Sequence, residues 1–568
     1  MIAVKISTVL LFLGLVHSSL QDEKLPKVNT PLGSIIGYHK KSRNGKAYRA
    51  FEGVPYAAPP VGELRFQPPK PVQSWEGDLP ANKKSSVCTQ YLMSGISGTG
   101  ERVTGCEDCL YLNIYVPERN NNKELLPVMF WIHGGAYQFA SGNEANETFI
   151  MDTNVVLVTV NYRLGPFGFL STGDKEVPGN MGLKDQSLAL RWVHDYIKNF
   201  GGDPNQITIF GMSAGGSSVH YHYLTKWSAG LFQRGISISG VALNPWPQTE
   251  NAPEKAKKLG AILGCPTDDS YSLVSCLQSR PARLISQAVG DFMYWKYNPF
   301  TPFGPVVEKE GDNPFISDTP INVIAKGEAT DVPWITGVVS EEGLYPAAEF
   351  VNDDKLLKQL NDDWDKIAPY LLDCNDTIPL SQQKAVVEKI RKYYLGSKEI
   401  NKDSVMPLIH MIGDRLFSVD CEKAARLQAK RNKSPVWTYL YSYRASHSLS
   451  DGFTNSDRNF GVSHGDDIFL VLSTGLSNVV KPKDIEMQNL LVKLYTSFAI
   501  EGKPRVDKAK WEPLKHNEKS YRYLHIAAPQ KVNMHSDDNF AQKKFWSTIK
   551  FNENKVCHKK HGKKKGKH

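Results

Sequence analysis

The chain has 568 residues and a formal net charge of +9, and 41% of its residues are hydrophobic, 22% charged and 10% aromatic. These fractions are those of an ordinary globular protein and exclude a low-complexity chain. The length allows roughly three or four average domains, or one large α/β domain with insertions, and either can bury a sizeable core.

The first residues have the pattern of a secretory signal peptide. Lys5 gives a short basic start, and residues 8–16 form an apolar run that is too short to cross a bilayer. Val16 and Ser18 satisfy the small-residue rule before a cleavage site. We therefore expect a signal peptide over residues 1–18 and a secreted, soluble mature protein. The alternative is a plain buried helix.

The segment from residue 126 to residue 225 predicts alternating strands and helices. "VMFWI" (128–132) and "NVVLVTV" (154–160) are short β-branched runs typical of buried strands. Residues 181–200 have apolar side chains at helical spacing, and two glycines end that helix. "NQITIF" (205–210) predicts a strand that runs into "GMSAGG", and a helix follows. This order predicts an α/β fold with a largely parallel sheet, interrupted by a mostly helical stretch over 350–435.

The turn "GMSAGG" (211–216) places Ser213 between a predicted strand and a predicted helix. G-x-S-x-G in that context is the pattern of a nucleophile elbow, in which glycines permit a tight turn and the serine hydroxyl stands above the sheet. The start of the following helix directs positive partial charge at the site. A glycine-rich turn without chemistry is the alternative, and the strand before it favours the nucleophile.

A serine nucleophile needs a base and a carboxylate that orients the base. In α/β-hydrolases these follow the serine in the order Asp or Glu, then His. Glu341 and Glu342 end an apolar run directly before a glycine, and His464 lies in a glycine-flanked loop, "NFGVSHGDDIFL". "WIHGGAYQFASG" (131–142) has the form of a loop that supplies backbone N–H groups to an oxyanion. An ordinary loop histidine and a plain tight turn are the alternatives.

The C-terminal residues 551–568 are predicted to form a disordered, lysine-rich tail. Residues 555–568 contain seven lysines, no acid and few apolar side chains. One interpretation is a solvated tail. The other is a contact with a polyanion, such as a heparin-like sugar or an anionic surface. We expect no nucleic-acid partner for an exported chain.

The possible glycosylation sites and the eight cysteines are also consistent with export. Asn-x-Ser/Thr triplets begin at Asn146, Asn375 and Asn432, the last being the weakest because a proline follows it. Disulfides are permitted in an exported protein. Cys265 could pair with Cys276, and Cys88 with either Cys106 or Cys109, but spacing does not decide the pairing. There is no paired CxxC pattern of a zinc site, and the pair His220 and His222 lies in a predicted helix, so we expect no metal.

Together these segments resemble the type-B carboxylesterases, the cholinesterase-like family of α/β-hydrolases. The resemblance spans about residues 30 to 545 in the family's order, which makes chance negligible. The variants "GMSAGG" and "HGGAY" are most similar to those of secreted insect carboxylesterases, a group with venom and antennal members. The matching segments are "FEGVPYAAPPVGELRF" (51–66), "EDCLYLNIYVP" (107–117), "WIHGGAYQFASG" (131–142), "VNYRLGPFGFL" (160–170), "GNMGLKDQSLALRWV" (179–193), "FGGDPNQITIFGMSAGG" (200–216), "TGVVSEEG" (336–343) and "GVSHGDDIF" (461–469).

The resemblance implies a single α/β-hydrolase domain over residues 19–550, with a mostly parallel central sheet flanked by helices and with helical insertions. It implies a secreted enzyme, without a cofactor, that hydrolyses small carboxylic esters through an acyl-serine intermediate. Ser213 would be the nucleophile and His464 the base that later acts as acid. Glu342, which directly precedes the glycine, would be the triad carboxylate instead of Glu341. Because a histidine base must be neutral, we expect activity to rise across about pH 6–7.

Other roles also follow from the resemblance. The backbone N–H groups of Gly135, Ala136 and Ala214 would form the oxyanion hole. The implied disulfides are Cys88–Cys109 and Cys265–Cys276, which leaves Cys106 as an extra; a Cys374–Cys421 pair is a guess, and Cys557 would stay free or pair between chains. The implied structural ion pairs are Arg65 with Glu107 and Arg163 with Asp185. Trp246 is assigned either to the acyl pocket or to the core.

The chain departs from the family pattern at several positions. Met212 stands where the family usually has a glutamate before the serine, and Ala136 stands where the oxyanion loop usually has a third glycine. No tryptophan lies between Cys88 and Cys109, so a cation–π site for choline is not expected. Met212 also argues against a juvenile hormone esterase. A narrow hormone or pheromone esterase and a non-catalytic binding protein remain alternatives, but all three triad positions are filled.

Overall fold

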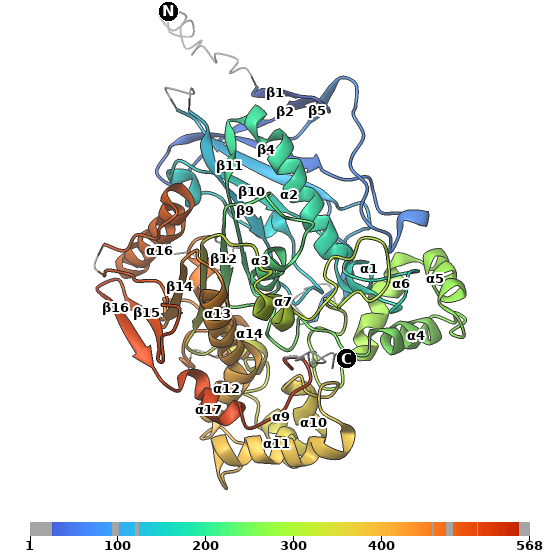
Figure 1. Ribbon diagram of the computed structural model, residues 1–568, viewed down its shortest axis with the longest axis vertical. Coiled ribbons are helices and arrows are strands. Elements are labelled where there is room, and N and C mark those ends of the chain that lie inside the picture. The colour runs from blue at the N-terminus through green and yellow to red at the C-terminus, as the bar shows by residue number, and fades with distance from the viewer. Residues whose placement is uncertain are drawn as a thin grey trace, which may run out of the picture.

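The computed structural model describes residues 25–93, 101–119, 124–456, 458–472, 481–507 and 509–555; the signal peptide predicted over residues 1–18 lies outside them. An eleven-stranded sheet runs through the molecule in the order β16-β15-β14-β13-β12-β11-β9-β10-β8-β4-β3 (Figure 1). Its strands are β3 (Tyr38–Lys41), β4 (Ala47–Pro55), β8 (Tyr111–Pro117), β9 (Leu126–Ile132), β10 (Val156–Val160), β11 (Gly202–Met212), β12 (Arg234–Ile238), β13 (Trp334–Val339), β14 (Val436–Tyr441), β15 (Tyr521–Ala528) and β16 (Lys531–Asp537).

The centre of this sheet is parallel and its two margins are antiparallel. The pairings from β10 through β9, β11, β12, β13 and β14 to β15 are parallel. The hairpin β15–β16 and the strands β8, β4 and β3 are antiparallel. The predicted α/β class with a mostly parallel sheet is therefore confirmed. Two small sheets lie outside it, one of β1 (Lys27–Thr30), β2 (Gly33–Ile36) and β5 (Asp78–Pro80), the other of β6 (Gln90–Tyr91) and β7 (Val103–Thr104).

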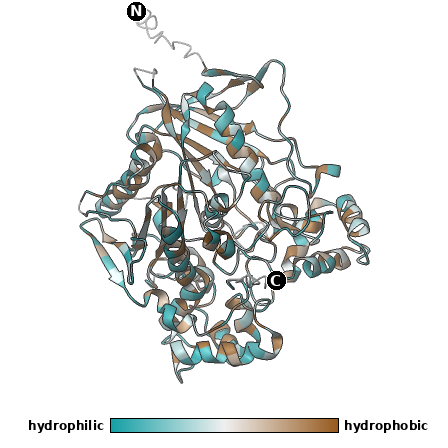
Figure 2. Cartoon of the chain, viewed as in Figure 1, coloured by the Kyte–Doolittle hydropathy of each residue, from teal (hydrophilic) through white to brown (hydrophobic). Residues whose placement is uncertain are grey.

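The central strands are buried on both faces, which explains why they are apolar without alternation. In β9, Val128, Phe130 and Ile132 face one hydrophobic layer, and Met129 and Trp131 face the other. Figure 2 shows the apolar residues concentrated along these strands. The first layer is covered by α2 (Met181–Phe200), α3 (Ala214–Leu224) and α13 (Val419–Arg431), and the second by α16 (Pro482–Glu501).

The predicted local elements are confirmed where the pattern was strongest. Gly201, with φ of 100°, ends α2 and donates its N–H to the carbonyl groups of Ile197 and Lys198. Residues 350–435 are mainly helical. The other helices are α1 (Gly165–Phe169), α4 (Ala252–Ile262), α5 (Ser270–Ser279), α6 (Ala282–Gln287), α7 (Pro320–Lys326), α8 (Leu344–Ala347), α9 (Asp354–Asp362), α10 (Trp364–Leu371), α11 (Leu380–Leu395), α12 (Val405–Gly413), α14 (Leu449–Thr454), α15 (Asp466–Phe469) and α17 (Lys543–Trp546).

None of the helices in these described ranges is both long enough and apolar enough to cross a membrane. The three glycosylation triplets all lie within the described ranges, and each asparagine is partly exposed. In the first triplet, the Thr148 hydroxyl donates a hydrogen bond of 2.7 Å to Oδ1 of Asn146. In the third, Nδ2 of Asn432 donates to the Thr330 carbonyl group at 3.0 Å.

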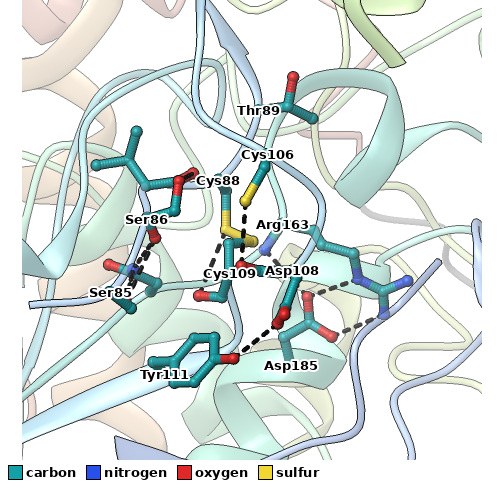
Figure 3. Close-up of a disulfide and its surroundings, with 12 residues drawn as sticks. Ser85, Ser86, Cys88, Thr89, Cys106, Asp108, Cys109, Tyr111, Arg163 and Asp185 are labelled. Atoms are coloured by element: carbon teal, nitrogen blue, oxygen red, sulfur yellow. Dashed lines mark hydrogen bonds and ion pairs between the residues drawn. A yellow bond between two sulfur atoms is a disulfide. The ribbon is translucent and has the colours of Figure 1, made fainter. Parts of the chain in front are cut away.

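Two disulfides join Cys88 to Cys109 and Cys265 to Cys276. Figure 3 shows the first of them, with Cys106 on the neighbouring segment. Cys106 is a free, exposed thiol; its backbone forms an isolated bridge with that of Cys88. The two cysteines that spacing left as alternative partners of Cys88 therefore lie close together, and Cys109 is the one bonded.

The guessed disulfide between Cys374 and Cys421 is wrong. Both thiols are free and buried, and burial raises the pKa of each to about 12. Cys421 lies in α13 and its Sγ is 3.4 Å from the Thr336 hydroxyl on β13, whereas Cys374 lies beyond the end of α10. Each thiol packs in the core instead of bonding to the other.

Buried ion pairs hold the loops around the sheet. Arg163 donates to Asp185 from Nε at 2.8 Å and from Nη2 at 2.7 Å, and its backbone N–H also donates to this carboxylate (Figure 3). Arg65 makes the same bidentate contact with Glu107, donating from Nε and Nη2 to the two carboxylate oxygens. A bidentate carboxylate contact fixes the guanidinium plane. Both pairs implied by the family resemblance are present in the structure.

The last described residues are folded, although they belong to the segment predicted to be a tail. Glu553 is buried and its Oε1 accepts a hydrogen bond of 2.9 Å from Arg415. The guanidinium group of Arg415 also lies 3.7 Å from the ring centre of Phe551. Packing therefore continues at least to Asn554, whose Nδ2 donates to the Leu243 carbonyl group, and residues 556–568 of the predicted tail lie outside the described residues.

Candidate active site

Ser213, the predicted nucleophile, connects β11 to α3. Its φ and ψ are 59° and −122°, a conformation that costs free energy in a residue with a side chain and is found mainly at functional sites. The turn is held because the Ser213 N–H donates to the Ile238 carbonyl group at 2.8 Å, and the Ser217 N–H donates to the Ser213 carbonyl group at 2.9 Å. The strain is thus supported by β12 on one side and by α3 on the other.

The glycines of the turn are required by close backbone contacts. A Cβ on Gly211 would lie 2.7 Å from the carbonyl oxygen of Ile132, and one on Gly216 would lie 2.7 Å from that of Ile238. A Cβ on Gly215 would clash with the Ile132 carbonyl group. Side chains at these three positions would clash with the backbone, so glycine is required for the tight turn.

Glu342 and His464 are brought together from two separate segments. Glu342 follows β13, and His464 precedes α15. Nδ1 of His464 lies 2.5 Å from Oε2 of Glu342, so the ring donates to the carboxylate. The other carboxylate oxygen, Oε1, accepts the Val339 N–H at 2.9 Å. Both side chains are buried, and Nε2 of His464 has no hydrogen-bond partner among the described residues.

The serine turn, the histidine loop and the 131–142 loop meet at Met212. A Cβ on Gly134 would lie 3.1 Å from Cβ of Ser213 and 3.5 Å from Sδ of Met212. A Cβ on Gly465, the residue after the histidine, would lie 3.0 Å from Cε of Met212. Met212 therefore fills the space between the two loops that flank Ser213, in the place of the glutamate usual in the resembled family.

The loop predicted to bind an oxyanion has an unusual backbone. Gly135, Ala136 and Tyr137 all have positive φ, at 93°, 53° and 60°. The N–H groups of Gly135, Ala136 and Ala214 have no hydrogen-bond partner within the described part of the chain. The Ala136 peptide is held by Gln138, whose Nε2 donates to the Ala136 carbonyl group at 3.2 Å. Ala136 thus adopts the left-handed geometry that normally favours glycine and keeps its N–H available.

Aromatic rings enclose the histidine. The ring centre of Phe417 lies 4.5 Å from that of His464, and the ring of Tyr345 lies 5.4 Å away on a nearly parallel plane. Phe417 belongs to a π-helical turn between α12 and α13. Trp246 is buried and packs on Phe417 and Phe300, and its Nε1 donates to the Leu416 carbonyl group. Trp246 is therefore a core residue in the layer next to the histidine.

Sequence reasoning missed Phe417, Tyr345 and Asp467. Asp467 is fully buried, and Oδ2 accepts the Tyr439 hydroxyl at 2.8 Å. Burial, with the nearby Glu342 charge, raises the pKa of Asp467 to about 7, against the effect of the tyrosine hydrogen bond. The repeated acid in "HGDD" was the only available signal for Asp467, and no pattern pointed to Phe417.

His220 and His222 are packed in the core. Nδ1 of His220 accepts the Ala242 N–H and Nε2 lies 3.0 Å from Gln428. The His222 nitrogens lie 2.8 Å from the Ser228 hydroxyl and 3.0 Å from Gln186. Burial lowers the pKa of both rings to about 3, so they are neutral. Among the described residues, no group of three or more His, Cys, Asp or Glu side chains could hold a metal ion.

The doubly covered parallel sheet, with a strained serine at the end of a central strand, defines an α/β-hydrolase. Comparison with known proteins identifies the family within this fold class. The model of the "Carboxylesterase family" matches residues 24–546, and the chain belongs to that family. It is a carboxylic ester hydrolase.

Two bee proteins are similar to it over nearly their whole length. "Venom carboxylesterase-6" of Apis mellifera is 64% identical, and the match covers 98% of this chain and 100% of the relative. "Carboxylic ester hydrolase" of Bombus ignitus is also 64% identical, over 96% of this chain and 98% of the relative. The crystal structure of juvenile hormone esterase from Manduca sexta, with OTFP covalently attached, has a TM-score of 0.79 and 27% identity, over 92% and 99% of the two chains.

Proposed function

We propose that the protein hydrolyses carboxylic esters with Ser213 as nucleophile, His464 as general base and Glu342 as the orienting carboxylate. The contact of 2.5 Å between Nδ1 of His464 and Oε2 of Glu342 carries this proposal. It puts the donor proton on Nδ1 and leaves the buried Nε2 free to accept a proton. A base oriented in this way is what a serine hydroxyl needs in order to attack an ester.

The proposed reaction has two similar halves. In the first, Oγ of Ser213 attacks the ester carbonyl carbon while Nε2 of His464 takes its proton, and the alcohol leaves with that proton. In the second, water attacks the acyl-serine with the same base, and the carboxylic acid departs. The free N–H groups of Gly135, Ala136 and Ala214 would stabilise the tetrahedral oxyanion, at about 2.7–4 kcal/mol for each donor. No step requires a metal or an organic cofactor.

The substrate is proposed to be a small ester with an apolar acyl group. The rings of Phe417 and Tyr345 beside the histidine support an apolar environment. One relative is called a venom carboxylesterase and others juvenile hormone esterases, so a single physiological ester remains the second candidate. The absence of a tryptophan between Cys88 and Cys109 argues against a choline ester.

The experiment that tests the proposal combines turnover with covalent labelling. We expect the purified protein to hydrolyse nitrophenyl acetate and nitrophenyl octanoate, with activity rising across about pH 6–7. An organophosphate should stop turnover and add its mass to the peptide that contains Ser213. Label on another residue would contradict the assignment. Label on Ser213 without turnover of either ester would indicate an enzyme for a narrower substrate.

The protein is proposed to be secreted, with one domain that begins at residue 19 after removal of the signal peptide and extends past residue 550 to at least Glu553. Its two disulfides and the name of its venom relative support export. Asn146, Asn375 and Asn432 are proposed as glycosylation sites, because each is partly exposed. Asn432 is the weakest of them, since its Nδ2 already donates to a backbone carbonyl group.

The lysine-rich C-terminus is proposed to bind a polyanion. A groove of about 630 Å³ lies where the described chain ends, and its lining includes Lys423, Lys544, Lys550 and Lys555. The acids in the same groove are buried, and two of them are ion-paired: Glu553 with Arg415 and Glu422 with Lys543. The cationic side chains thus outnumber the exposed anionic ones where the tail begins.

Removal of residues 556–568 is expected to lower the salt concentration at which the protein elutes from immobilised heparin. Fewer lysine side chains then attract the polyanion, so less salt is needed to screen that attraction. Esterase activity should not change, since the deletion leaves the Glu553 contact with Arg415 in place. Elution at the same salt concentration would contradict a polyanion-binding role for the tail.

A further inference from the structure

Glu341 precedes the proposed triad carboxylate and binds the backbone of the histidine loop. Its Oε2 accepts the Val462 N–H at 2.7 Å and the Ser340 hydroxyl at 2.5 Å. The Glu341 N–H donates in turn to the Val462 carbonyl group at 3.1 Å. The side chain and backbone of Glu341 therefore hold the N–H and the carbonyl group of the same residue, Val462, two residues before His464.

The surroundings of Glu341 are shaped to this contact. Gly461 has φ of 108°, and a Cβ there would clash with the Glu341 carboxylate. Oε1 of Glu341 lies 3.8 Å from Nε2 of His410 on α12. Burial alone would raise the pKa of Glu341, but His410, the Ser340 hydroxyl and the Val462 N–H together lower it. The carboxylate is thus held in its charged form.

A second carboxylate holds the next peptide of the loop. Oδ2 of Asp466 accepts the Ser463 N–H at 2.8 Å, while Oδ1 accepts the Leu449 N–H at 2.9 Å. The consecutive N–H groups of Val462 and Ser463 therefore donate to two different carboxylates, those of Glu341 and Asp466. His464 is the next residue of the loop, and its ring is held by Glu342.

We propose that Glu341 is a positioning residue, which fixes the backbone before His464 so that Nε2 of the ring is aimed at Ser213. The two adjacent glutamates then have different tasks: Glu342 orients the imidazole ring and Glu341 orients the peptide that carries it. This inference rests on the proposed function of His464. It assigns to Glu341 no contact with the substrate.

The proposal depends on a hydrogen-bond acceptor at full side-chain length, and not on negative charge. Glu341→Gln keeps an amide oxygen that can accept the Val462 N–H. Glu341→Asp keeps the charge but shortens the side chain by one methylene, so the carboxylate no longer reaches that N–H. We expect Glu341→Asp to lower kcat about 100-fold, as small misplacements of catalytic groups do. Glu341→Gln should stay within a few-fold of wild type, and KM should change little in both variants.

A matched control is available at the other end of the same strand. Asp331 precedes β13, and its carboxylate accepts the N–H groups of Ser434 at 2.8 Å and Lys433 at 3.2 Å. Asp331→Ala therefore removes carboxylate–backbone hydrogen bonds far from the histidine loop. It should lower the melting temperature without lowering kcat.

The order of kcat among the two Glu341 variants and wild type tests the positioning role. If Glu341→Asp turns over faster than Glu341→Gln, charge matters and the positioning role is overturned. It is also overturned if both variants keep the wild-type kcat, or if KM rises while kcat stays constant. The rate at which an organophosphate labels Ser213 should fall in parallel with kcat. Wild-type turnover by Ser213→Ala would instead contradict the proposed function itself, whatever the ranking.

Discussion

Ser213→Ala is expected to lower kcat about 10⁶-fold, the loss found when the nucleophile of a serine hydrolase is removed. The methyl group of alanine cannot form the acyl intermediate, so only the oxyanion donors and substrate binding remain. KM for a nitrophenyl ester should change much less, because Ser213 is small and 5% exposed. The measurement is kcat and KM of the purified variant beside wild type.

The control for this variant is Ser217→Ala, one turn further along α3. Ser217 is buried, and its hydroxyl has no hydrogen-bond partner in the described residues. Its removal should leave kcat unchanged, which separates the loss of the nucleophile from a disturbance of the helix. If Ser213→Ala retained more than about one hundredth of the wild-type kcat, acyl-serine chemistry at this turn would be ruled out.

Glu342→Gln is expected to lower kcat about 10⁴-fold, the loss seen when a triad carboxylate becomes an amide. The structure indicates why the amide would be harmful. Oε1 of Glu342 accepts the Val339 N–H, so the amide oxygen of glutamine must take that place. The amide nitrogen then faces Nδ1 of His464 and donates to it. The ring proton is forced onto Nε2, which can no longer accept the proton of Ser213.

This prediction is checked by comparing the kcat of Glu342→Gln with that of Glu342→Ala. Alanine leaves the ring free to adopt either tautomer, so its activity should be equal to or higher than that of the glutamine variant. Melting temperatures of both variants show whether the fold survives. A glutamine variant with more than about one tenth of the wild-type kcat would show that Glu342 does not orient the base.

The sequence predicted those parts of the fold and of the candidate site that depend on short segments with a fixed backbone geometry. The strand–turn–helix at Ser213 could be predicted because the clash between Gly215 and the Ile132 carbonyl group imposes glycine at a fixed distance from the serine. The C-terminus of α2 could be predicted for a similar reason, since Gly201 must adopt a positive φ. Glu342 was selected over Glu341 only through the family's E-G pair.

The parts that could not be predicted depend on contacts between distant segments. Phe417 reaches His464 from a π-helical turn, and no periodic pattern signals such a turn. The predicted start of the tail at residue 551 is too early. A glutamate near a lysine-rich end suggests an exposed side chain, whereas in the fold Glu553 accepts a hydrogen bond from Arg415. The guessed pair of Cys374 and Cys421 is wrong for the same reason, because the packing of distant segments leaves both thiols free and buried.

The wide spacing of the site along the chain has a consequence for synthesis in the cell. Glu342 and His464 are 122 residues apart, and the turn with Ser213 is made still earlier. A domain generally folds as a unit, so the turn with Ser213 cannot meet the base proposed for it before residue 464 has been translated. An unfinished or truncated chain therefore carries an inert serine. If Ser213 and His464 act together as proposed, hydrolytic activity arises only after both segments have been translated and have come together in the fold.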